Sequence, residues 1–164
     1  MEEYTIYLKV TNACNLKCKH CYNACMNDVN CMNNEILEKA KLFILEFAKK
    51  HNNDEVNVQF HGGEPCLYDI NKLIDFVDDV NANNIKYSIT TNLVYKLTSD
   101  HLMLFKKMLP YDDVPYIMTS WDPGIRFPIG KLGVWEDNVE EAIKNGIKVQ
   151  PIVCVTKQLL KSYE

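Results

Sequence analysis

The cysteines near the N-terminus are the residues of this chain whose type and spacing could do chemistry. Five of the seven cysteines lie between Thr11 and Cys31. Cys14, Cys18 and Cys21 form the pattern C-x3-C-x2-C, which lets three thiolates converge on one metal centre from a single loop. A structural zinc site takes four ligands, whereas a four-iron cluster held by three cysteines keeps one iron free to bind something else. The three closely spaced thiols therefore favour an iron–sulfur cluster.

The remaining cysteines leave alternatives open. Cys25 and Cys31 could complete a zinc site with the first three, ligate a second centre, or be ordinary loop thiols. Cys66 and Cys154 are expected to pack as small apolar side chains. Cys154 could instead face the interior of the fold as a hydrogen-atom donor, which the alternation of side chains along a strand would allow.

The composition is that of an ordinary globular protein, with 47% hydrophobic and 24% charged residues. The 164 residues are expected to form a single domain over 1–164. The net charge of −4, without a basic stripe, argues against a broad nucleic-acid-binding face. No apolar run approaches the ~20 residues of a membrane span. The odd number of cysteines and the lack of a secretory signal favour the reducing cytoplasm over a disulfide scaffold.

Strand-like and helix-like segments alternate along the chain. Segments with a period of two predict five strands, at 4–11, 55–61, 85–92, 115–122 and 147–156. Apolar stripes with a helical period predict four helices, at 34–50, 69–80, 98–109 and 135–146. Repeated βα units of this kind predict an α/β fold, with a parallel sheet and helices on its outer face.

Individual residues predict the ends and the buried faces of these helices. Asp69, and Thr98 or Ser99, are expected to be N-caps, and Asn145-Gly146 is a common C-terminal signal. The expected buried stripes are Ile36, Leu37, Ala40, Phe43, Ile44 and Phe47 in the first helix, and Ile70, Leu73, Ile74 and Val77 in the second.

One face of the expected sheet carries polar side chains. Along 55–61, Asn57, Gln59 and His61 alternate with three apolar residues. Strands buried on both faces of a parallel sheet are usually apolar throughout, as in a packed barrel. The pattern therefore predicts an apolar face for the helices and a polar face that either lines a curved, incompletely closed barrel holding a ligand or is exposed to solvent.

Four short motifs, in this order, resemble those of the radical S-adenosylmethionine (SAM) enzymes. "CNLKCKHCY" follows the first expected strand, "HGGEP" (61–65) follows the second, "TTN" (90–92) ends the third and "SWD" (120–122) ends the fourth. The motif style is most similar to the peptide- and protein-modifying members, including the sulfatase-maturase type. The resemblance implies a partial (β/α)6 barrel. About five βα units are present, so an incomplete core domain is expected.

The resemblance implies a role for each motif residue. Cys14, Cys18 and Cys21 would ligate a [4Fe-4S] cluster whose fourth iron binds the amino and carboxylate groups of SAM. Contacts to the SAM amino group are expected from Gly62, Gly63 and Glu64, contacts to its ribose or carboxylate from Ser120, Asp122 and Arg126, and backbone contacts to adenine from Val155. His61 and Asn92 are expected beside the same pocket, although His61 could instead bond to the local backbone.

The implied activity is reductive cleavage of SAM to a 5′-deoxyadenosyl radical that takes a hydrogen atom from a substrate, with a peptide or protein as the expected substrate. A flavodoxin- or ferredoxin-type donor would supply the electron. The open edge of the sheet would suit a partner chain or a second copy. Three alternatives remain at this point: an activating enzyme that places a radical on a partner protein, an inactive domain that binds a cluster or SAM, and a zinc-stabilised binding module.

Overall fold

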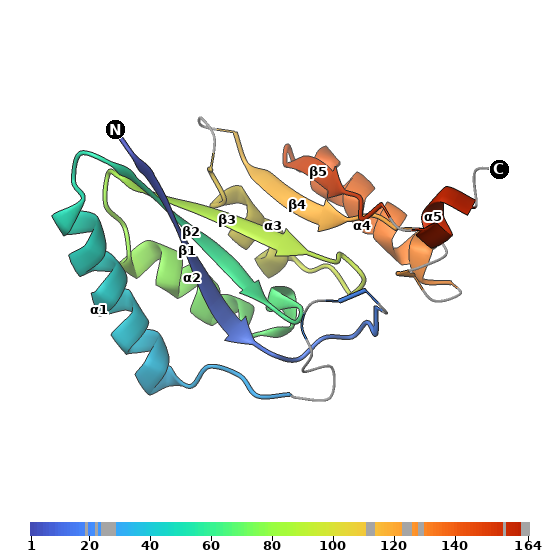
Figure 1. The fold of residues 1–164 in the computed structure, drawn as a ribbon, viewed down its shortest axis with the longest axis horizontal. Coiled ribbons are helices and arrows are strands. Elements are labelled where there is room, and N and C mark those ends of the chain that lie inside the picture. Colours follow the sequence, from blue (N-terminus) through green and yellow to red (C-terminus); the bar gives the residue numbers. More distant parts are fainter. Residues whose placement is uncertain are drawn as a thin grey trace.

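Five parallel strands form one sheet in the order β1-β2-β3-β4-β5 (Figure 1). The structure is a computed structural model, and it describes residues 1–18, 20–21, 23, 29–110, 114–122, 126–127, 130–155 and 157–161. The strands are β1 (Glu3–Thr11), β2 (Glu55–Gly62), β3 (Ile85–Thr91), β4 (Tyr116–Ser120) and β5 (Lys148–Ile152). All five strands were predicted within a few residues, and the predicted α/β fold with a partial barrel-like sheet is confirmed.

Helices connect successive strands. They are α1 (Asn34–Lys50), the short 3-10 helix η1 (Pro65–Leu67), α2 (Ile70–Asp79), α3 (Ser99–Lys106) and α4 (Lys131–Lys144), and the short helix α5 (Lys157–Lys161) follows β5. The predicted caps are confirmed, because the Asp69 carboxylate accepts the N–H groups at the start of α2 and the Thr98 hydroxyl accepts the His101 N–H. No helix among the described residues is long and apolar enough to cross a membrane.

Helix α4 begins four residues earlier than the predicted start at 135, and it contains Gly133 in its first turn. Glycine disfavours a helix, but side-chain contacts hold this one in place. The Trp135 indole N–H donates to the Thr119 hydroxyl over 3.0 Å, and the Asn138 amide donates to the carbonyls of Leu93 and Tyr95. These bonds dock α4 on the ends of β3 and β4, so tertiary contacts outweigh the local propensity.

The helices pack against the apolar face of the sheet. Val56, Val58 and Phe60 of β2 are fully buried in one core with residues of α1, α2, α3 and α4, whereas Asn57 and Gln59 on the other face are partly exposed. The predicted stripe of α2 is buried as expected. This division leaves the polar face free to line a site.

The predicted stripe of α1 is wrong at two positions. Ile36 and Phe43 are 50% and 58% exposed, and the buried residues of this helix are Leu37, Ile44 and Ala48. The predicted stripe is wider than the surface that α1 shares with the edge of the sheet, so its outer flank faces solvent.

Candidate functional site

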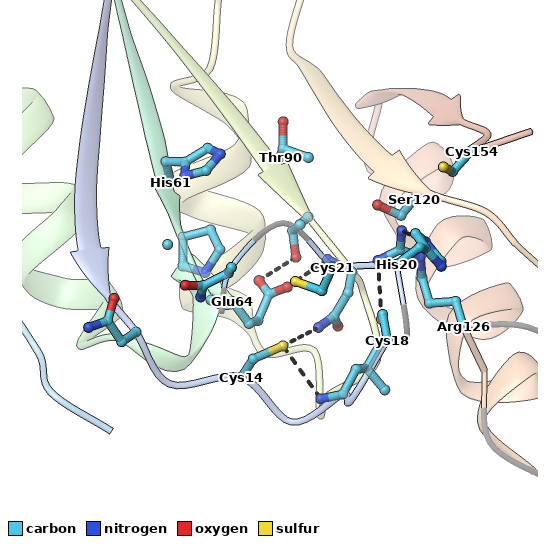
Figure 2. A pocket seen from close by; sticks show the side chains of 18 residues that line it. Cys14, Cys18, His20, Cys21, His61, Glu64, Thr90, Ser120, Arg126 and Cys154 are labelled. Carbon is cyan, nitrogen blue, oxygen red and sulfur yellow. Dashed lines mark hydrogen bonds between the residues drawn. The ribbon is translucent and has the colours of Figure 1, made fainter. Parts of the chain in front are cut away.

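The carboxyl ends of the strands surround a cavity of about 270 Å³ (Figure 2). Ligands commonly bind beyond the carboxyl ends of strands in open α/β sheets. Of the twelve residues predicted for the cluster and SAM, ten line this cavity: Cys14, Cys18, Cys21, His61, Gly62, Gly63, Glu64, Asn92, Ser120 and Arg126. Asp122 and Val155 are not among the lining residues. The former is fully buried beside the cavity and the latter is 69% exposed beyond β5.

The glycine pair Gly62–Gly63, at the end of β2, packs against the loop that leads to Cys14. The Gly63 N–H donates to the Thr11 carbonyl, and the Glu64 N–H donates to the Ala13 carbonyl, each over 2.8 Å. A Cβ atom at Gly63 would lie 2.3 Å from the Ala13 carbonyl oxygen, so no side chain fits there without a shift of the backbone. The close approach of these two segments therefore requires glycine.

The Glu64 carboxylate is completely buried and ties the end of β2 to the end of β3. It accepts the Thr91 hydroxyl over 2.7 Å, the Asn92 N–H over 2.6 Å and the Cys66 N–H over 3.0 Å. Burial raises the pKa of Glu64, although these three bonds act in the opposite direction. The predicted contact of Glu64 with SAM stays a prediction.

Asn92 links the end of β3 to the cysteine loop through its side-chain amide. Its side-chain amide donates to the Asn15 side-chain oxygen over 2.9 Å and lies 3.8 Å from the Cys14 sulfur. The Leu16 N–H also donates to the Cys14 sulfur, over 3.4 Å. The Asn15 amide donates in turn to the Val94 carbonyl. Cys14 is therefore held between its own loop and the end of β3, and burial raises the pKa of its thiol.

Arg126 and Asp122 hold the other side of the loop. The Arg126 guanidinium donates from Nε to the Asp122 carboxylate over 2.7 Å and from Nη1 to the Cys18 sulfur over 3.4 Å, and its Nη2 lies 3.0 Å from His20 Nε2. The other Asp122 carboxylate oxygen accepts the Cys154 N–H over 2.8 Å. Burial raises the pKa of Cys18, and the nearby guanidinium opposes that shift.

The donor set of this cavity fits an iron–sulfur cluster. Cys14 is half-buried, Cys18 is buried and Cys21 is exposed, and all three line the same space. Among the described residues, no three Cys, His, Asp or Glu side chains are grouped closely enough to hold a single metal ion. A cluster spreads its cysteine ligands over several irons, so three thiols that line one cavity without meeting at a single point suit it better than they suit one zinc ion.

The remaining cysteines have different surroundings. Cys66 is buried, as predicted. The prediction that Cys154 packs in the core is wrong: its side chain is exposed and lines the cavity, because the chain leaves the sheet after Ile152. Cys31 is exposed, with its sulfur 3.1 Å from the Thr11 hydroxyl and away from this cavity. Cys25 lies outside the described residues.

Asn15 and Thr91 belong to the site although the sequence predicted no role for them. Both form bonds that hold the predicted residues in place, and both stand inside the quoted motifs "CNLKCKHCY" and "TTN". Each is the direct neighbour of a predicted site residue, Asn15 of Cys14 and Thr91 of Asn92, and this adjacency was the available signal. His61 lines the cavity, and burial, assisted by Lys9, lowers its pKa.

A family model described as the Radical SAM superfamily matches residues 8–160. The chain belongs to the radical SAM superfamily. The cofactors of this superfamily are a [4Fe-4S] cluster and SAM, in agreement with the cofactors that the motifs implied.

Two curated relatives share part of this chain. The radical SAM cyclopropyl synthase TigE of Paramaledivibacter caminithermalis is 28% identical over 165 residues, which covers 87% of this chain and 31% of TigE. The uncharacterized protein MJ0907 of Methanocaldococcus jannaschii is 37% identical over 91 residues, which covers 53% of this chain and 29% of that protein. The chain thus spans about a third of the length of these relatives.

Solved structures of anSMEcpe share the fold. The native protein with bound SAM and the Cp18Cys peptide superposes with a TM-score of 0.72 at 20% identity, covering 98% of this chain and 45% of that one. A tagged form with bound SAM gives a TM-score of 0.76 at 18% identity, covering 100% of this chain and 45% of that one. The chain therefore corresponds to less than half of those proteins.

Proposed function

We propose that this chain binds a [4Fe-4S] cluster through Cys14, Cys18 and Cys21 and uses it to cleave SAM reductively. The observation that carries the proposal is the meeting of these three thiols with the Gly62–Gly63 turn at one cavity beyond the strand ends. When bound, the reduced cluster supplies the electron that breaks SAM into methionine and a 5′-deoxyadenosyl radical, which takes a hydrogen atom from the substrate.

The residues of the chain would bind and orient these cofactors. We assign the Gly62–Gly63 turn, together with Glu64, to the amino group of SAM, because all three residues line the cavity that the cysteines share. Ser120, at the end of β4, lines the opposite wall and offers a hydroxyl to the ribose. Asn92 and Arg126 act on the cysteine loop, because their described bonds run to Cys14 and Cys18.

The binding part of this proposal is tested by anaerobic reconstitution with iron and sulfide, followed by metal analysis and equilibrium dialysis with SAM. Iron and sulfide in the ratio of a four-iron cluster, with SAM bound only by the reconstituted protein, would support it. Stoichiometric zinc in place of iron would overturn it and favour a zinc-stabilised binding module.

We further propose a peptide or protein substrate. The support is the style of "CNLKCKHCY" and "HGGEP", which resembles peptide-modifying members, together with a cavity that opens beside the polar face of the sheet. The test is transfer of deuterium to 5′-deoxyadenosine, read by mass spectrometry. The peptide fraction of deuterated cells should supply deuterium, whereas deuterated nucleosides and sugars should not. The reverse result would overturn the assignment.

We also propose a flavodoxin- or ferredoxin-type electron donor. A partner chain or second copy at the open β5 edge and a cytoplasmic location stay predictions from the sequence. Reduction of the reconstituted protein by flavodoxin, followed by the absorbance of the cluster, tests the donor. An unchanged spectrum with a donor of sufficiently low potential would overturn that proposal.

A further inference from the structure

A charged side chain contacts one of the three predicted cluster ligands. Arg126 donates from Nη1 to the Cys18 sulfur over 3.4 Å, although the two residues are 108 positions apart in the sequence. The Arg126 side chain is only 17% exposed, so solvent weakens this contact little. Asn92 makes the corresponding contact to Cys14 with a neutral amide. Two of the three sulfurs therefore receive side-chain donors of different charge.

Asp122 holds the guanidinium in this orientation. It lies four residues before Arg126, is completely buried, and accepts Arg126 Nε over 2.7 Å. The Arg126 backbone N–H also donates to the Asp122 carbonyl over 2.9 Å. The second carboxylate oxygen is occupied by the Cys154 N–H at the end of β5. The carboxylate is thus anchored to the sheet and leaves the two terminal nitrogens of Arg126 pointing at the cysteine loop.

All three nitrogens of the guanidinium have described partners. Nε contacts Asp122, Nη1 contacts Cys18 and Nη2 lies 3.0 Å from His20 Nε2. The sequence resemblance assigned Arg126 to the carboxylate of SAM. In this structure the three nitrogens contact Asp122 and the loop that carries the three predicted cluster ligands.

We propose that Arg126 raises the reduction potential of the cluster by donating to the Cys18 sulfur, and that Asp122 is the residue that positions it. This inference rests on the proposed function. Hydrogen bonds to the sulfurs and nearby charge are established determinants of cluster potential. Reduction adds a negative charge, which a fixed guanidinium stabilises more than it stabilises the oxidised form.

The test is a redox titration of the reconstituted protein without SAM, followed by electron paramagnetic resonance. Arg126→Gln should shift the midpoint potential to a more negative value while the iron content stays that of the parent. Arg126→Lys keeps the positive charge but loses the planar guanidinium. The midpoint potential of its cluster should therefore lie between those of the parent and Arg126→Gln. Lys144→Gln is the matched control, because Lys144 also pairs with a carboxylate four residues away but lies on the exposed side of α4. Its potential should equal that of the parent.

The role of Asp122 is read from a double-mutant comparison. If Asp122 positions the guanidinium, Arg126→Gln shifts the potential less in the Asp122→Asn background than in the parent. An equal shift in both backgrounds would overturn the positioning role.

The outcomes separate this inference from the proposed function. A cluster with the same potential in the parent, Arg126→Gln and Arg126→Lys, together with weaker SAM binding, would overturn the inference and return Arg126 to the SAM carboxylate. If Arg126→Gln holds no iron, Arg126→Lys alone decides: a parent-like potential overturns the inference, and a more negative one supports it. A parent protein that assembles no cluster would overturn both.

Discussion

The Glu64 carboxylate, just beyond β2, accepts the backbone N–H of Asn92, just beyond β3, over 2.6 Å inside the protein. This bond holds the ends of β2 and β3 next to each other. The Asn92 side chain in turn donates a hydrogen bond to Asn15, the residue that follows Cys14 in the cysteine loop. The residues that would bind the two cofactors are therefore joined by one buried network, and not only by their separate strands.

Replacement of Glu64 tests this connection. Glu64→Gln should lower the free energy of unfolding by about 1–3 kcal/mol. In either orientation of the glutamine side chain, its NH2 group would face a group that now donates a hydrogen bond to the carboxylate. Both carboxylate oxygens now accept such donors, from Thr91, Cys66 and Asn92. Urea unfolding of the cluster-free protein measures the change. Glu46→Gln, on the exposed side of α1, is the control. Equal stability of the two variants would contradict the role of Glu64.

A methyl group at Gly63 should separate the glycine turn from the cysteine loop. The added Cβ would meet the Ala13 carbonyl oxygen at 2.3 Å and the Asn12 carbonyl oxygen at 2.4 Å, so the backbone must move. Gly63→Ala should lower both the stability and the iron content after reconstitution. Gly133→Ala is the matched control, since nothing lies within 4 Å of its added Cβ and its position is helical. It should stabilise the protein by up to about 1 kcal/mol. Parent-like iron binding by Gly63→Ala would refute the required close approach.

Single alanine replacements of Cys14, Cys18 and Cys21 should each abolish cluster assembly, because a four-iron cluster needs all three thiolates. Iron and sulfide analysis after anaerobic reconstitution measures the loss. Cys31→Ala should retain the parent content, since Cys31 is exposed away from the cavity. Loss of metal in Cys31→Ala would instead indicate a centre with more thiolate ligands.

The stability of the cluster-free protein should fall as the pH drops below about 6.5, in part through His101. Burial lowers the pKa of His101, and this outweighs its contacts with Cys66 and Asp100. The unfolded chain therefore binds the proton more readily, so protonation favours unfolding from the ordinary pKa down to the folded value. His101→Phe should show a smaller fall, which thermal unfolding across this range measures. The comparison with the parent is needed because the raised pKa of Glu64 acts in the opposite direction. An identical pH dependence in parent and variant would contradict this prediction.

Periodicity and capping residues predicted most of the fold. Asp69 and Thr98 cap the helices that the sequence assigned to them, because a capping bond forms within a few residues and needs no knowledge of the tertiary structure. The start of α4 depends on distant partners. Trp135 and Asn138 form hydrogen bonds to Thr119 of β4 and to Leu93 beyond β3. These bonds stabilise the start of α4, although Gly133 disfavours a helix there.

The sequence placed the residues of the site, but not the bonds between them. Strand ends in a parallel sheet lie at one edge, so the motif order predicted one shared site for all twelve residues, and ten of them line the cavity. Arg126 contacts Cys18, which is 108 positions away in the sequence, and Asp122, which is four positions away. The longer contact depends on the tertiary structure and could not be predicted from local sequence. The exposure of Cys154 depends on where β5 leaves the sheet.

Cleavage of SAM at the cavity beyond the strand ends is the activity that we propose for this chain. The most direct test is to reduce the anaerobically reconstituted protein with dithionite, add SAM and measure 5′-deoxyadenosine by chromatography, with Cys18→Ala as the blank. We expect 5′-deoxyadenosine from the parent and none from the variant. A parent protein that carries a reduced four-iron cluster and binds SAM, but forms no 5′-deoxyadenosine, would contradict this proposal.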